Sequence, residues 1–543
     1  MKPGASARVQ RLVSNGHVKR QYRLISALSA EVTPGELQQL RRSADVLNIS
    51  ADSRVTGNVD TTLDPTSALT DTESPTTDTY YASGATLGDV QQLKATLGVN
   101  GSGLTGSGVG IAVIDSGIAA NSDLAGRVVA AYDFTAGGQP SALVDPYGHG
   151  THIAGLIAGS GQGSAGRYVG IAPKARLISL RVLDAQGVGN TSDVIAAVEF
   201  ATTYRTQLGI DIINLSLGHP ILEPAATDPL VQAVEHAVAS GIVVVVAAGN
   251  YGTNPETGAI GYAGIASPGN APSALTVGAA KTFGTADRSD DQIAPYSSRG
   301  PSWYDGIAKP DIIAPGHGLV AMTEPSGTLY QTYPQLHADV APYIKLSGTS
   351  MATGVVSGVV ALMIEANRAK SWFSVPLAPN AVKALLEYTA IGIPDDDERT
   401  PAPLEQGTGE INGAGAITLV RAINFAIPFG QLWLQTAVQP YSTIGGRSLP
   451  WSQRVVWGDH VLGGSLTTWH EAAWAANIVW GDSSVWGSNI VWGDNIVWGD
   501  NIVWGDNVVW GDNIVWGDNI VWGDNIVWGD NIVWGDSLTS SAN

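Results

Sequence analysis

Apolar and polar residues follow two patterns along the middle of the chain. Between about residues 80 and 428, short continuous apolar runs are separated by longer stretches in which apolar residues recur every three or four positions. The runs predict buried β-strands, and the stretches predict amphipathic helices. Such strands, separated by helices, are typical of a mainly parallel sheet covered by helices on both faces. The predicted strands are 108–115, 176–183, 210–217, 241–248 and 274–280, and the predicted helices include 191–207 and 228–239.

The N-terminal part of the chain has a pattern of its own. Residues 20–55 predict a strand, a helix and a second strand, which would make a small α+β unit. The helix start has Thr33 as a cap, Pro34 in the first turn and Glu36 three residues after the cap, as in a capping box. Residues 56–79 are rich in Thr, Asp, Ser and Pro and are predicted to form an exposed linker.

The C-terminal end repeats the hexapeptide NIVWGD, with small variations, ten times over residues 477–536. Six residues advance a helix by about 600°, so successive copies would share no helical face. In a strand, the even period keeps Ile, Trp and Asp on one side and Asn, Val and Gly on the other. A stacked β-solenoid or a series of short hairpins is therefore expected, with disorder as the competing interpretation.

These patterns divide the chain into four parts. Residues 1–76 are expected to form the N-terminal unit and its linker, 77–428 the α/β domain, 429–476 an irregular linker and 477–543 the repeat tail. The predicted fold class is therefore α/β with a mainly parallel sheet, preceded by a small α+β unit and followed by a β-type or disordered tail.

Composition and charge narrow the range of functions. The 543 residues have a formal net charge of −20, which argues against a nucleic-acid partner. There is no Cys, so disulfides, thiolate metal sites and cysteine catalysis are excluded. No run approaches the about eighteen apolar residues of a transmembrane segment. The basic N-terminus lacks the apolar core of a signal peptide, so export would need a trimmed signal, an upstream start or another route.

Ser350 lies in the stretch KLSGTSMATGVVSGVVALMIEA, where small residues lead into an apolar run with helical spacing. One interpretation is a helix cap, whose hydroxyl accepts hydrogen bonds from the first backbone N–H groups. The other is a nucleophile at a helix N-terminus, where the macrodipole favours developing negative charge. A nucleophile would also need a base, an orienting acid and donors for an oxyanion.

Three further polar residues lie where predicted strands end or helices begin. Asp115 ends one strand, His149 begins a helix between two glycines, and Asn250 follows another strand. Alone, each has an ordinary structural interpretation, as a turn residue, a structural or surface histidine and a turn-forming amide. His149 and His152 would also suit a metal, but a spacing of three and a missing Glu depart from the H-E-x-x-H pattern. In open parallel sheets, functional groups gather at the carboxyl ends of strands.

Together, these motifs resemble the subtilisin-like serine proteases, the subtilases. The matching segments are VIDSG with Asp115, GHGTHIAG with His149, AAGN with Asn250 and SGTSMATG with Ser350. Asp, then His, then Ser is the chain order of that family. The resemblance covers about residues 80–428 and includes VGIAPKARLISLRVLD, INLSLG, YSSRGP and KPDIIAPG.

The resemblance implies a serine endopeptidase of broad specificity that works through an acyl-enzyme. Ser350 would attack the peptide carbonyl and His149 would take and return the proton. Asp115 would orient His149, and Asn250 would help to hold the oxyanion. Strand edges that pair with an extended peptide, and pocket walls that suit a large apolar side chain, are also implied. These edge and wall residues are Gly187, Val188, Gly189, Ser216, Leu217, Gly218, Ala247, Ala248 and Gly249.

No cofactor is expected to be required, and no metal site is predicted. Asp123 matches a residue that binds calcium in some subtilases, but the loop that completes their site has no clear match in GSGQGSAGRY. Asp123 is therefore expected to be an ordinary surface residue, and a structural calcium ion is left open without a clear site. Gly354 stands where the family usually has Pro, a change that affects helix geometry and no catalytic group.

Functions can also be predicted for the two ends of the chain. Residues 20–55 resemble the inhibitory propeptide of secreted subtilases, which templates folding and occupies the active cleft until it is cut; a permanent small domain is the alternative. The expected partners are protein or peptide substrates and the chain's own propeptide, and the expected location is outside the cell or at its surface. The Trp-rich repeats at 477–536 are expected to bind a surface or other copies, and to be dispensable for cleavage. An alternative from another class is a catalytically silent adhesive protein that acts through this tail.

Overall fold

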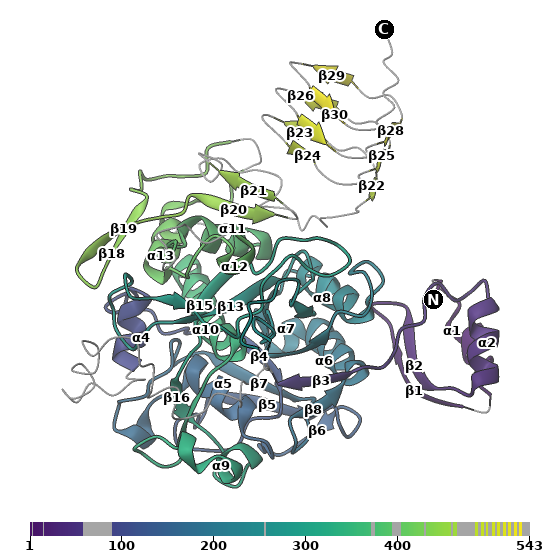
Figure 1. Cartoon of the computed structure of the whole chain (residues 1–543), viewed down its shortest axis with the longest axis horizontal. Helices are drawn as coiled ribbons and strands as arrows, with labels where there is room; N and C mark the ends of the chain where they lie inside the picture. The colour runs from purple at the N-terminus through teal and green to yellow at the C-terminus, as the bar shows by residue number, and fades with distance from the viewer. Residues whose placement is uncertain are drawn as a thin grey trace.

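The computed structural model describes residues 1–57 apart from 3 and 15, then 90–254, 257–370, 375–393, 403–427, 431–457 and 460–463. It also describes the short strands of the repeat tail between residues 484 and 534. Most of the linker expected at 56–79 lies outside these residues. Figure 1 shows a central unit of helices and strands, a small N-terminal unit beside it and the strands of the tail above it.

The central unit is built on a nine-stranded sheet in the order β14-β13-β11-β9-β4-β7-β5-β6, with β15 paired to β13. Its strands are β4 (Gly110–Asp115), β5 (Val128–Asp133), β6 (Gln139–Pro140), β7 (Arg176–Arg181), β9 (Ile212–Leu215), β11 (Val243–Ala247), β13 (Leu275–Lys281), β14 (Gln292–Ile293) and β15 (Ile312–Pro315). The short strands β6 and β14 pair antiparallel, and the other pairings in this sheet are parallel. The predicted mainly parallel sheet is confirmed.

Alternate residues of the central strands enter two cores, one on each face of the sheet. In β4, Ile111 and Val113 belong to the core that α5 and α10 share, whereas Ala112 and Ile114 belong to the core that α6 and α8 share. Side chains on a strand alternate between faces, so burial on both faces requires a continuous apolar run. The main helices are α4 (Val90–Thr96), α5 (His149–Ala158), α6 (Thr191–Thr203), α8 (Pro229–Ala239), α10 (Thr349–Arg368), α11 (Pro379–Thr389) and α13 (Gly413–Ala422).

Helix α10 runs through the middle of one core. It contacts α5 and α13 as well as β9, β11, β13 and β15. Among the described residues, it is the one helix long and apolar enough to cross a membrane, yet 94% of its most apolar window is buried inside the protein. Its position in the core accounts for its apolar composition.

The strand predicted at 210–217 is in fact two strands that belong to different sheets. β9 lies in the central sheet, and β10 (Leu217–Pro220) leaves it to pair antiparallel with β3 (Arg54–Gly57). The break falls at Ser216. Leu215 and Leu217, on either side of the break, are both apolar, so the change of sheet leaves no mark on the hydrophobic pattern of residues 210–217.

The N-terminal unit differs from the predicted strand, helix and strand. A hairpin takes the place of the first strand, and the capping box of Thr33 and Glu36 starts the helix as predicted. The second strand, β3, pairs with β8 and β10 of the central unit instead of with the hairpin. The elements are α1 (Ser6–Gln10), β1 (His17–Tyr22), β2 (Ala27–Glu31) and α2 (Pro34–Arg42), and β8 spans Val188–Asn190.

The segment after α13, predicted to be irregular, contains two antiparallel hairpins. β18 (Tyr441–Ile444) pairs with β19 (Arg447–Pro450), and β20 (Arg454–Trp457) pairs with β21 (His460–Gly463). Trp451, between the hairpins, is buried in the core beside α11, where its ring lies 6.4 Å from that of Tyr388. Packing against helices that precede it in the chain therefore orders this segment.

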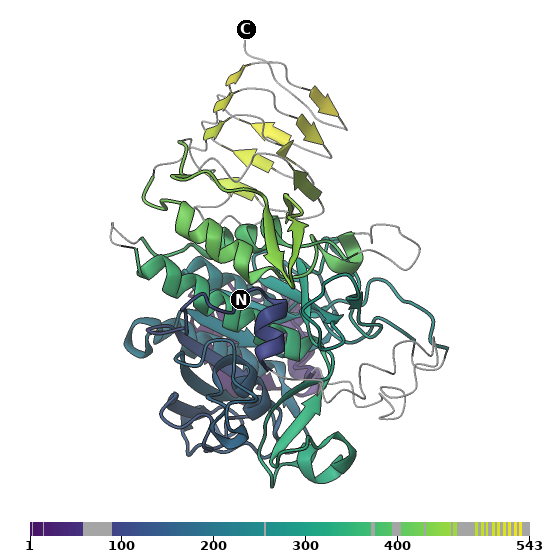
Figure 2. The ribbon, with the colours of Figure 1, turned by 90° about the vertical axis from the view of Figure 1, so that its left-hand side faces the viewer.

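The strands of the repeat tail pair in parallel. Residue 484 pairs with 502 and 502 pairs with 520, an offset of 18 residues, or three hexads. Two further stacks repeat the same offset, so three strands follow one another around each coil. This arrangement is the stacked β-solenoid of the sequence expectation, and not the series of hairpins. Figure 2 shows the strands in layers above the central unit. The strands run from β22 to β30: Ser484–Trp486, Ile490–Trp492, Ile496–Val497, Ile502–Trp504, Val508–Trp510, Ile514–Trp516, Ile520–Trp522, Ile526–Trp528 and Ile532–Trp534.

Candidate active site

Asp115 and His149 meet at the carboxyl end of the central strands. Asp115 is the last residue of β4, His149 is the first residue of α5, and both side chains are fully buried. Nδ1 of His149 lies 2.7 Å from Oδ1 of Asp115. A carboxylate at Nδ1 favours the tautomer that carries its proton there, which leaves Nε2 as the basic nitrogen. Gly148 precedes the helix with a φ of 100°, a backbone conformation that favours glycine.

Asp145, which sequence reasoning missed, holds the start of α5. Its carboxylate accepts hydrogen bonds from the N–H of Gly148 at 2.8 Å, and from the N–H and hydroxyl of Thr151 at 2.8 and 2.6 Å. The carboxylate thereby satisfies N–H groups that a helix start leaves without partners. Burial raises the pKa of Asp145. An Asp a few residues before a predicted helix start was the available signal.

Ser350 is the second residue of α10 and is fully buried. Its hydroxyl donates to the carbonyl of Ser216 at 2.9 Å. Nε2 of His149 is buried and has no hydrogen-bond partner within the part of the chain that the structure describes. The structure thus forms the contact between Asp115 and His149, whereas the hydroxyl of Ser350 is bonded to a main-chain carbonyl.

Asn250 is oriented by Thr349, the first residue of α10, which sequence reasoning also missed. The side-chain oxygen of Asn250 accepts from the N–H of Thr349 at 3.1 Å and from its hydroxyl at 2.9 Å. The same hydroxyl accepts from the N–H of Gly249 at 3.2 Å. Because the oxygen end of the amide faces Thr349, its NH₂ end faces the other way. In the sequence, the available signal for this contact was the Thr directly before Ser350 in the motif SGTS.

The predicted substrate edges flank strand β3 on both sides. On one side, Gly187 accepts a hydrogen bond from the N–H of Gly57 at 3.2 Å, and β8 continues the pairing. On the other side, Gly57 lies opposite Leu217 in β10. A Cβ atom placed on Gly57 would lie 3.4 Å from Nδ1 of His149. Residues 54–57 of the chain itself thus pair with five of the predicted substrate-binding residues, Gly187, Val188, Gly189, Leu217 and Gly218.

A pocket of about 300 Å³ adjoins the predicted pocket walls. Ala248, one of those walls, packs with Ile221 and Ile265 in a small buried cluster, and both isoleucines line the pocket. Tyr251, directly after Asn250, lines it as well. The full lining is Pro220, Ile221, Tyr251, Ala263, Gly264, Ile265 and Trp303. The pocket is apolar and aromatic, and its outer residues carry no motif from which the sequence would predict them.

Asp123 and His152, the residues considered for metal binding in the sequence, both lie buried and bonded to other protein groups. Asp123, expected at the surface, is 1% exposed, and its oxygens accept from the N–H of Gly163 and the hydroxyl of Tyr343, each at 2.7 Å. The surface prediction was wrong, because hydrogen bonds inside the protein compensate its burial. His152 contacts the carbonyl of Leu319 through Nε2 at 3.1 Å, and burial lowers its pKa to about 3. Among the described residues, no three His, Asp or Glu side chains are grouped to hold a metal ion.

The comparisons with known proteins match the part of the chain that contains Asp115, His149 and Ser350. The model of the subtilase family matches residues 106–415, more than half of the chain. Serine protease AprX of Bacillus subtilis is 39% identical over 323 residues, which cover 59% of this chain and 68% of that protein. Subtilisin DY of Bacillus licheniformis is 36% identical over 267 residues, 49% of this chain and 80% of that protein. Subtilisin E of Bacillus subtilis is 32% identical over 363 residues, 66% of this chain and 76% of that protein. The chain therefore belongs to the subtilase family and is a serine-type endopeptidase.

Proposed function

We propose that Ser350, His149 and Asp115 are the nucleophile, general base and orienting acid of this endopeptidase. The contact of 2.7 Å between His149 and Asp115, at the strand end that faces the start of α10, carries the proposal. The hydroxyl of Ser350 would turn from the carbonyl of Ser216 toward Nε2 of His149, which would take its proton as the oxygen attacks a peptide carbonyl. The imidazolium would then protonate the leaving amine, and water would hydrolyse the acyl-enzyme by the same steps in reverse.

Two groups would hold the oxyanion of the tetrahedral intermediate. One is the N–H of Ser350, among the first N–H groups of α10, which have no partner inside the helix. The other is the NH₂ end of Asn250, which Thr349 turns away from itself. No cofactor is needed for these steps, since every proton and charge is handled by a side chain or a backbone group.

The substrate would bind as a strand between β8 and β10, where β3 lies in this structure. Main-chain pairing on both sides gives affinity with little sequence preference, so broad specificity is expected. The apolar pocket beside Ala248 and Tyr251 supports a preference for a large apolar side chain next to the cut bond.

We propose that the N-terminal unit is an inhibitory propeptide. Three contacts support this role besides β3. Arg20 pairs with Asp193 at 2.7 Å, the Tyr22 hydroxyl donates to the carbonyl of Ser192 at 2.7 Å, and Asp52 accepts from the N–H of Ser192 at 2.9 Å. All three involve the start of α6, whose N–H groups favour a carboxylate. A protease inhibited in this way fits export as an inactive form, so action outside the cell or at its surface is expected.

The register of β3 suggests where the propeptide would be cut. Gly57 lies opposite Leu217, and Ser216, the preceding residue on that edge, binds the hydroxyl of Ser350 through its carbonyl. The bond to be cut would then lie shortly after Gly57. We therefore expect self-cleavage between Asn58 and Val59, inside the linker predicted at 56–79.

The test compares the wild-type chain with Ser350→Ala and a control, Ser347→Ala, which removes a hydroxyl three residues away. Wild type and Ser347→Ala should hydrolyse casein and begin at Val59 by N-terminal sequencing. Ser350→Ala should do neither, because the nucleophile is missing. Equal casein hydrolysis by Ser350→Ala would refute the assignment of the nucleophile, whereas cleavage at another bond would refute only the register.

A further inference from the structure

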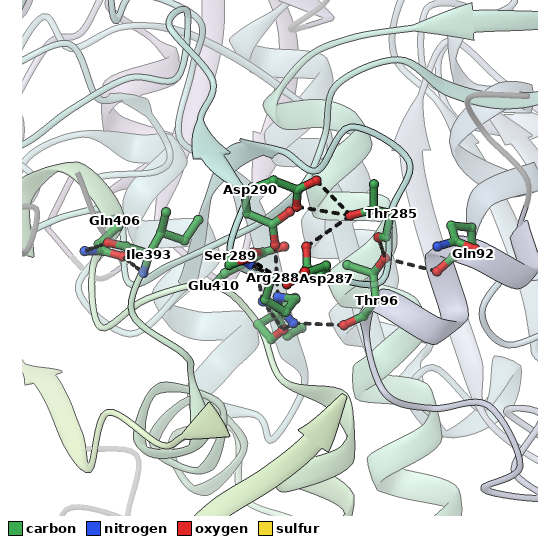
Figure 3. Close-up of polar contacts among 12 residues, drawn as sticks. Gln92, Thr96, Thr285, Asp287, Arg288, Ser289, Asp290, Ile393, Gln406 and Glu410 are labelled. Atoms are coloured by element: carbon green, nitrogen blue, oxygen red, sulfur yellow. Dashed lines mark hydrogen bonds and ion pairs between the residues drawn. The ribbon is translucent and has the colours of Figure 1, made fainter. Parts of the chain in front are cut away.

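Arg288 lies fully buried where three distant segments of the chain meet. Its Nη1 donates to the carbonyl of Thr96, the last residue of α4, at 2.9 Å and to that of Ile411 at 3.1 Å. Figure 3 shows Arg288 between Glu410 and Thr96. The guanidinium thus connects α4, the first described helix after the linker, with the loop around residue 288 and the segment before α13.

Two carboxyl groups share this one guanidinium. Oε2 of Glu410 lies 2.8 Å from Nη2 of Arg288, and Oδ2 of Asp291 lies 3.1 Å from its Nε. The side chains of Arg288, Asp291 and Glu410 are exposed by only 1%, 0% and 0%. If both carboxyls were ionised, one negative charge would remain uncompensated in the interior, and proteins avoid that state by protonating one group.

Among the principal charged groups that act on Asp291, Arg288 is the one cation. The principal charged groups that act on Asp291 are Arg288 and Asp290 on its own loop and Glu410 from the facing segment. Asp290 adds negative charge, and its oxygens lie 3.1 Å from the hydroxyl of Thr285. Two further cations lie on neighbouring segments. Arg447 is at the surface and pairs with Asp287 at 3.0 Å, and Lys281, opposite Gln292 in the sheet, has its Nζ 4.6 Å from the centre of the Phe283 ring.

We propose that Asp291 and Glu410 share one proton as a hydrogen-bonded acid and carboxylate, and that its loss in alkaline solution opens the junction held by Arg288. The O–H of Asp291 donates to the carboxylate of Glu410, so the cluster is neutral with Arg288. Hydroxide removes this proton as the pH rises, and two carboxylates then repel each other beside one guanidinium. This device is independent of the catalytic proposal, since none of its groups belongs to the candidate active site.

The direction of the pH effect on stability follows from the pKa of Asp291 in the folded and in the unfolded protein. Burial first, and the charge of Glu410 second, raise the pKa of Asp291 from its ordinary value to about 10. Between its unfolded and folded values, Asp291 binds a proton only in the folded protein. Its contribution to stability is therefore complete below the unfolded value of 3.8, falls as the pH rises above that value, and is lost once the pH has passed the folded value near 10. Loss of the junction would release α4, which buries Leu93 in the core.

The experiment measures the thermal midpoint of the full chain between pH 7 and 11, after a covalent serine-protease inhibitor has stopped self-digestion. Asp291→Asn keeps the shape and a donor toward Glu410 but cannot ionise. We expect its midpoint to fall less with pH than that of wild type, and to exceed it by about 3 °C or more near pH 10.5. The control Asp287→Asn, on the same loop at the surface, should follow wild type.

The proposal is overturned if Asp291→Asn and wild type lose stability in parallel up to pH 11. If Asp291→Asn does not fold, Glu410→Gln decides, because it removes the same surplus charge from the other side of the pair. A flatter pH dependence in Glu410→Gln supports the shared proton. Failure of both variants to fold at pH 7 would mean that two ionised carboxylates are required, and would also overturn it.

Discussion

The orientation of Asn250 depends on one neighbouring side chain. Thr349 binds the amide oxygen of Asn250 through both its N–H and its hydroxyl, and that contact decides which end of the amide faces away from α10. A serine at the start of a helix is therefore only part of the site. The preceding threonine positions the amide that would stabilise the oxyanion, and it does so from the same helix end.

Removing these groups should affect the rate rather than the binding of substrate. Asn250→Ala should lower kcat about 10²–10³-fold, because one oxyanion donor is lost. Thr349→Val keeps one of the two bonds to Asn250, so a smaller loss of about tenfold in kcat, with little change in KM, is expected. Hydrolysis of a soluble peptide anilide measures both constants.

Thr353→Val is the matched control for this prediction. It removes a buried hydroxyl one turn later on α10, where Thr353 donates to the carbonyl of Thr349 at 2.8 Å and does not contact Asn250. Its kcat should remain close to that of wild type. A rise in KM with unchanged kcat in Thr349→Val would show that Thr349 acts on substrate binding and not through Asn250.

At the scale of elements, helix α10 carries Ser350 near its start and contains two interior glycines, which differ in the space around them. A Cβ on Gly354 would meet Ile153 at 3.4 Å, an ordinary contact, whereas a Cβ on Gly358 would lie 2.6 Å from the Cβ of Ile171. Gly354 stands where the family usually has Pro. Because a side chain at this position would have room, close packing does not explain the glycine.

The two glycines should therefore respond in opposite ways to substitution by alanine. Gly354→Ala should raise the free energy of unfolding by up to about 1 kcal/mol, because alanine is the better helix former and its methyl group has room. Gly358→Ala should lower the free energy of unfolding, since Ile171 would have to move. Thermal unfolding of both variants decides it. A midpoint for Gly354→Ala below that of wild type would show that the helix needs this glycine.

At the scale of the whole molecule, the end of the α/β unit lies beyond the last predicted element. Trp433, Trp451 and Val455 are buried in the same core as α10 and α13, with exposures of 1%, 4% and 1%. The repeat strands, in contrast, pair with one another at an offset of 18 residues. The hairpins after α13 thus stabilise the peptidase unit, and we propose that the repeats serve binding or self-association.

Two truncations separate these roles. A chain that ends after residue 463 should cleave a short soluble peptide at a rate close to that of the full chain, and should lose only binding to surfaces or other copies. A chain that ends after residue 430 should unfold at a much lower temperature, because removing even one buried aromatic side chain costs about 3–5 kcal/mol. Turnover and thermal midpoint are measured for both. A drop of more than tenfold in turnover for the longer chain, with its fold intact, would assign the repeats to the catalytic unit.

The sequence by itself determined the class of the fold and the residues of the candidate site. Continuous apolar runs and helical spacing are local consequences of burial, so they predicted the central strands, the helices and the capping box at Thr33. Asp115, His149, Asn250 and Ser350 each lie at the end of such an element, but it was the resemblance of their four motifs to the subtilases that singled them out. The six-residue period of the tail likewise allowed a stacked β-solenoid as one of its predicted structures.

Only the tertiary structure decided which partners these residues meet. Strand β3 pairs with β8 and β10, more than a hundred residues away, because the edge that accepts a strand depends on the arrangement of the whole sheet. Asp123 is buried because Tyr343 and Gly163 satisfy its oxygens, and Asp291 and Glu410 come together only when α13 packs beside its neighbours. Hydrogen bonds and charge pairs between distant segments leave no period in the sequence, since their free energy arises only once packing has excluded water from both partners.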